Sequence, residues 1–156
     1  MRRKEAAALS KLKRILFGTD FTPASRKAFE EALSLCRETG AELLLAHVYS
    51  TPASLPAELA LTPDTYEQLD EKLREDAQAK LRALGEEARR VEVRERTFLL
   101  SGAPDEALVE AAGQTGVDLV VLGTHGRTGA ARFFLGSVAS KVIATASCPV
   151  LTVRAA

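Results

Sequence analysis

The chain has 156 residues with 46% hydrophobic content, and its 21 Lys and Arg side chains balance 21 Asp and Glu side chains. This length favours a single domain with a sizeable core. A net charge of zero gives no electrostatic reason to expect nucleic acid or an acidic membrane surface as a partner, and no apolar run approaches the ~20 residues of a membrane span.

Strand-like and helix-like segments alternate along the chain. Strands are expected at residues 14–18, 41–49, 91–100, 117–123 and 148–153. Helices are expected at residues 23–39, 64–90, 104–113 and 136–147. Thr22 before Pro23 is typical of a helix N-cap, and Gly40 of a helix stop. The proline-punctuated residues 50–63 are expected to form a loop with at most one helical turn.

Five strands separated by four helices predict an α/β domain with a doubly wound, Rossmann-like parallel sheet and helices on both faces. We expect the strand order 3-2-1-4-5 and a domain at residues 13–154. The preceding residues 1–12 are basic but lack the apolar core of a secretory signal, so they are interpreted as a solvated leader.

The cysteines and histidines do not indicate a metal or disulfide site. Cys36 and Cys148 have no CxxC spacing, and only two histidines accompany them. A zinc site and a disulfide framework are therefore not expected, and a cytoplasmic protein with reduced thiols is the default.

Two loops indicate a site at the point where the strand order reverses. One follows the first strand at residues 18–22, and the other, at residues 123–129, contains three glycines and Arg127. Glycines let backbone N–H groups approach phosphate oxygens, and Gly136 with Ser137 opens a helix whose N-terminus attracts anions. A phosphorylated ligand is predicted, with Arg127 near a terminal phosphate.

Several of these residues have a second interpretation, which the sequence leaves open. Asp20 either accepts from a ribose hydroxyl, or lies near a phosphate-bound metal, or caps the helix that follows. The glycines either approach a ligand or only turn the chain. His47 is expected to be a buried residue at a strand end rather than a catalytic base. No P-loop, G-x-G-x-x-G or G-x-S-x-G pattern is present.

Residues 13–153 resemble the universal stress proteins, and specifically their ATP-binding branch. The resemblance rests on "RILFGTDFTPASRKAFEEAL", "LLLAHVY", "GAPDEALVEAA" and the closing third of the chain. Within that third, the branch motif G-x2-G-x9-G-[ST] is matched by Gly123, Gly126, Gly136 and Ser137. Gly18 departs from the family pattern, because many members carry proline or a bulkier residue there.

The resemblance implies a role for each matching position. Adenine would lie near Thr19 and the backbone of Val48, and the ribose and metal near Asp20. The sugar would contact Leu122 and Gly123. The phosphates would be bound by the remaining matching residues, Gly126, Gly136, Ser137 and Val138.

The resemblance also implies a homodimer, paired through the last strand at Pro149–Val153. The alternative is a monomer whose strand edge is blocked by Pro149 and Arg154.

The function expected from this sequence is ATP binding, with Mg²⁺, by a regulatory or protective module of the stress response. No catalytic residue is assigned, because no titratable pair in the two loops forms a nucleophile with an activating base. The alternatives are a slow ATPase or nucleotidyl-transfer enzyme, a structural dimer that binds nothing, or a site for AMP or a cyclic nucleotide.

Overall fold

The computed structural model describes residues 12–54, 56, 61–124 and 135–154. The strands are β1 (Arg14–Gly18), β2 (Glu42–Val48), β3 (Glu95–Leu100), β4 (Leu119–Gly123) and β5 (Val150–Val153). The helices are α2 (Pro23–Thr39), α3 (Pro63–Arg90), α4 (Pro104–Thr115) and α5 (Ser137–Thr145), with a short 3₁₀ turn η1 (Pro52–Ser54).

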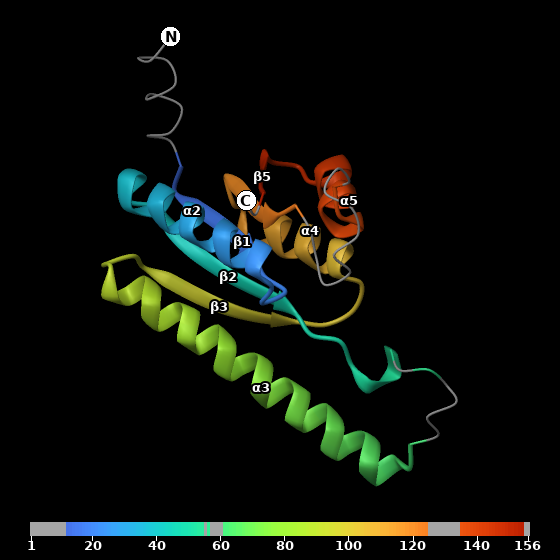
Figure 1. The fold of residues 1–156 in the computed structure, drawn as a ribbon. Coiled ribbons are helices and arrows are strands. Elements are labelled where there is room, and N and C mark those ends of the chain that lie inside the picture. The colour runs from blue at the N-terminus through green and yellow to red at the C-terminus, as the bar shows by residue number, and fades with distance from the viewer. Residues whose placement is uncertain (1–11, 55, 57–60, 125–134, 155–156) are drawn as a thin grey trace.

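The five strands form one parallel sheet in the order β3-β2-β1-β4-β5, which confirms the predicted topology (Figure 1). Helices α2 and α3 cover one face, where Phe29 packs on Phe17 and Leu81 belongs to the same cluster. Helices α4 and α5 cover the other, where Leu108 and Val142 belong to the same cluster as Leu16. Because both faces are covered, the central strands are near-continuous apolar runs.

Four strands begin later than the sequence predicts, β2 by one residue at Glu42 and β4 by two residues at Leu119. β3 begins at Glu95 rather than at residue 91, because a turn follows α3 and Glu92 adopts a left-handed φ of 63°. β5 begins at Val150 rather than at residue 148. Pro149 has no N–H to donate, but its carbonyl still accepts from the Val120 N–H at 3.0 Å.

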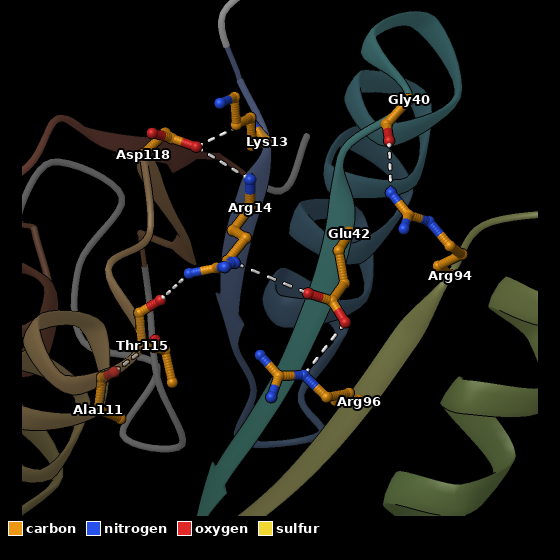
Figure 2. Close-up of polar contacts among 9 residues, drawn as sticks. All are labelled: Lys13, Arg14, Gly40, Glu42, Arg94, Arg96, Ala111, Thr115 and Asp118. Atoms are coloured by element: carbon orange, nitrogen blue, oxygen red, sulfur yellow. Dashed lines mark hydrogen bonds and ion pairs between the residues drawn. The ribbon is translucent and has the colours of Figure 1, made fainter.

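A polar network connects the strands at their amino ends (Figure 2). Asp118 accepts hydrogen bonds from the backbone N–H groups of Lys13 and Arg14, at 2.7 and 3.0 Å. The Arg14 guanidinium donates to the Thr115 carbonyl at 2.7 Å and lies 3.9 Å from Glu42. This network fixes the position at which residues 12–14 enter the sheet.

Both cysteines are free thiols, with Cys36 buried and Cys148 half-buried. Burial raises the pKa of the Cys36 thiol to about 12, so it stays protonated near neutral pH. In the part of the chain that the structure describes, no helix combines the length and apolar character needed to cross a bilayer.

Candidate functional site

A cavity of about 280 Å³ opens at the carboxyl end of the sheet, near the lower limit for small-molecule sites. Its walls come from the ends of β1, β2 and β4 and from the first turns of α2, α4 and α5. Eight residues singled out in the sequence line it: Thr19, Asp20, Val48, Leu122, Gly123, Gly136, Ser137 and Val138. The other two, Gly126 and Arg127, lie outside the described residues.

The loop between β1 and α2 is held against β2 by a buried histidine. The Nδ1 atom of His47 lies 2.7 Å from the Thr19 carbonyl oxygen, so Nδ1 carries the proton and donates. The His47 ring packs on Phe21, with 4.4 Å between ring centroids. Phe21 has a φ of 60°, an uncommon conformation for a bulky residue, and it persists here because these contacts hold the loop.

Asp20 supports the helix cap and is not itself the cap. Thr22 is the N-cap of α2, and its side chain accepts from the Ser25 N–H at 3.3 Å. The Oδ1 atom of Asp20 accepts from the Thr22 N–H at 3.0 Å and from the Thr22 hydroxyl at 2.6 Å. The expectation that Asp20 itself caps the helix is therefore wrong. Both bonds use one carboxylate oxygen and the residue also lines the cavity, so this supporting role leaves a ligand role open.

The start of α5 lines the cavity, and its N-cap residue has no side chain with which to cap the first-turn N–H groups. The Gly136 N–H donates to the Thr124 carbonyl at 2.7 Å, which brings the helix start to the end of β4. Gly136 is the N-cap and makes no side-chain hydrogen bond, and the first turn contains no acidic residue. Such a helix terminus, with Ser137 beside it, suits an anion.

Gly123 has a packing role that does not depend on any ligand. A Cβ at this position would lie 3.0 Å from the backbone atoms of Ala24 and Ser25, in the first turn of α2. Backbone atoms cannot rotate away as a side chain can. Any other residue here would therefore push the start of α2 away from the end of β4 by a few tenths of an ångström.

Comparison with known proteins assigns the family. The sequence profile described as the universal stress protein family matches residues 11–154. The chain belongs to this family.

Relatives in the family cover most of this chain. The universal stress protein MJ0531 of Methanocaldococcus jannaschii is 36% identical over 144 residues, covering 91% of this chain and 82% of its own. The structure of MJ0577 from the same organism is 29% identical, with a TM-score of 0.80, over 93% of this chain and 97% of that one. A universal stress protein solved in complex with cAMP is 25% identical, with a TM-score of 0.66, over 93% and 98%.

Several residues that line the cavity of this universal stress protein carry no ligand-binding motif in the sequence. They are Ser25, Ala46, Ser50, Pro104, Leu108 and Ala139. The sequence held a signal for two of them, Pro104 and Leu108. They are four residues apart at the start of a helix that follows a strand, so they share the helix face that can border a site at the strand ends. The others depend on how the elements cross in space.

Among the described lining residues, few side chains carry charge, so backbone dipoles contribute much of their electrostatic field. Asp20 is the charged side chain among the described lining residues, and no Lys or Arg is among them. The described residues also contain no group of three or more His, Cys, Asp or Glu able to hold a metal ion. A divalent cation would therefore be held largely by a ligand's phosphates, with Asp20 nearby.

Proposed function

We propose that this universal stress protein binds an adenine nucleotide, ATP with Mg²⁺, in the cavity at the carboxyl ends of β1, β2 and β4, and acts in the cytoplasm as a regulatory module. The observation that carries the proposal is the convergence on one cavity of the β1–α2 loop, the end of β4 and the uncapped N-terminus of α5. The relative of 25% identity solved with cAMP supports the nucleotide class.

The chain's own groups suggest how the ligand would be oriented. Phosphates would accept hydrogen bonds from the first N–H groups of α5 and from the Ser137 hydroxyl. The nucleoside would lie toward Val48 and Leu122, where the wall is apolar. Mg²⁺ would neutralise phosphate charge, and Asp20 would provide a carboxylate for it from the cavity wall.

Regulation would follow from linking segments that are far apart in the sequence. A nucleotide that contacts both the β1–α2 loop and the start of α5 favours the conformations in which the two are correctly placed. The β1–α2 loop and the start of α5 would then present a different surface in the bound protein than in the free protein, and a partner protein could recognise that difference.

A charge introduced at Ser137 tests the proposal. Ser137 is the first residue of α5, where aspartate favours the helix but repels phosphate. We expect Ser137→Asp to keep the fold and weaken MgATP binding at least about tenfold in calorimetry, since about 1.4 kcal/mol of repulsion suffices. In hydrogen exchange, MgATP should slow the first turn of α5 in the wild type and not in the variant.

The matched control is Ser147→Asp, which adds the same charge at an exposed position beyond the other end of α5. It should bind MgATP like the wild type. Equal affinities for the wild type and Ser137→Asp, or no nucleotide binding by the wild type, would refute the proposal.

A further inference from the structure

Gly18 ends β1 on the floor of the cavity, between two leucines from other elements. Its partner in the sheet register is Leu122 of β4, and Leu108 of α4 lies beside both. A Cβ on residue 18 would lie 2.6 Å from Cδ2 of Leu122 and 3.2 Å from both Cδ atoms of Leu108. Any side chain at residue 18 therefore forces a leucine to move.

The cavity is the open space into which these leucines can move. Leu122 and Leu108 are 4% and 5% exposed, and both belong to the cluster that packs α4 and α5 on the sheet. That interior is close-packed, so it does not take up extra volume. Both side chains also line the cavity, so a displaced leucine can move into the cavity rather than into the packed interior.

We infer that Gly18 sets the depth of the cavity and is a specificity-determining residue for the nucleoside part of the ligand. The inference rests on the nucleotide-binding function proposed above. The floor formed by Gly18, Ala46, Leu108 and Leu122 is apolar, whereas the uncapped start of α5 is polar. A base and sugar suit the apolar end, so residue 18 controls how large a nucleoside fits.

The test compares two Gly→Ala variants by calorimetry with MgATP and with AMP. Gly18→Ala should lower the affinity for both ligands by the same factor, about tenfold, because the displaced leucine would occupy space needed by the adenosine that the two ligands share. Gly113→Ala is the matched control, since a Cβ on this residue of α4 meets nothing within 4 Å. It should bind both ligands like the wild type.

A second substitution should reverse the effect of the first. Leu122→Val removes about the volume that Gly18→Ala adds, so the double variant should recover wild-type affinity to within about twofold, as contacting residues are strongly non-additive. Leu122→Val alone deepens the cavity and should bind 2-methylthio-ATP better, relative to ATP, than the wild type does. This single variant provides a test even if Gly18→Ala folds poorly.

Three results would overturn the inference while leaving nucleotide binding intact. They are wild-type affinity in Gly18→Ala, a loss that differs between MgATP and AMP, and a loss that Leu122→Val does not relieve. If the wild type binds no nucleotide, the proposed function fails instead. A crystal structure of Gly18→Ala then still decides the cavity depth: leucines turned into the cavity support it, and a displaced β1 backbone refutes it.

Discussion

At the scale of single residues, Asp20 illustrates how one carboxylate can hold a loop and face a ligand site. Its Oδ1 atom fixes the backbone and hydroxyl of Thr22, and that hydroxyl oxygen in turn caps α2. Charge is not needed for this structural role, because an amide oxygen also accepts hydrogen bonds. Charge would be needed for a role beside a phosphate-bound cation.

The two roles of Asp20 are separable by substitution. Asp20→Asn keeps an acceptor for Thr22 and removes the charge, so AMP binding without metal should be unchanged and MgATP binding about tenfold weaker. Calorimetry with both ligands measures this difference. An equal loss for AMP and MgATP would show that Asp20 acts on the shared nucleoside or through the loop conformation, and not through the metal.

At the scale of elements, β5 is an edge strand with one side unpaired within the described chain. The carbonyls of Pro149 and Val153 accept from β4, so the N–H groups of Val150 and Thr152 point to the outer edge. Leu151 is 37% exposed. A short, partly apolar edge of this kind is suited to pairing with a second copy about a two-fold axis.

We expect the wild type to be a dimer paired through β5, and Thr152→Pro to be a monomer. Proline at this position removes an outward N–H and leaves the β4 ladder intact, which is where edge strands tolerate it. Light scattering coupled to size exclusion gives the mass, and circular dichroism checks that the variant is folded. A wild type that stays monomeric at high concentration contradicts the expectation.

At the scale of the whole molecule, the two ends of the parallel strands differ in what they do. The cavity lies at the carboxyl ends of the strands, and charged side chains stabilise the amino ends. There, Glu42 lies between Arg14 and Arg96, and Asp118 binds the chain where it enters β1 (Figure 2). The N–H groups of Lys13 and Arg14 hold the pKa of Asp118 below its ordinary value.

This lowered pKa makes a prediction about acid stability. Because the Asp118 pKa is lower in the folded state, its contribution is complete above the unfolded pKa of about 3.9 and is lost as pH falls through the folded value. Asp118→Asn should lower the unfolding free energy by about 1 kcal/mol at pH 7, less than the ~1.5–3 kcal/mol of a buried charged hydrogen bond, because the group is partly in water.

Urea unfolding at a series of pH values tests this. The difference between wild type and Asp118→Asn should shrink below about pH 3.9. Asp76→Asn, on the exposed face of α3, is the control and should show no such dependence. A difference that stays constant with pH would mean that Asp118 stabilises the fold without using its charge.

The sequence by itself determined the order of the elements and the strand topology. The bounds of β1 and the N-cap at Thr22 could be predicted because they depend on local signals, an apolar run stopped by Gly18 and a Thr-Pro pair. Eight of the ten proposed ligand residues also line one cavity, because the carboxyl ends of parallel strands meet at one edge. The start of β3 at Glu95 could not be predicted, because the alternation of polar and apolar residues begins at residue 91 and does not reveal the turn after α3.

Only the tertiary structure decided what the glycines are for. A Cβ on Gly123 would press on the backbone of α2, and one on Gly18 would displace Leu108 or Leu122, which lie about ninety and one hundred residues further along the chain. Neither constraint is visible in the sequence, where both glycines simply end strands. The physical reason is that the space for a Cβ depends on how closely distant elements pack, and that distance is set only when the whole domain folds.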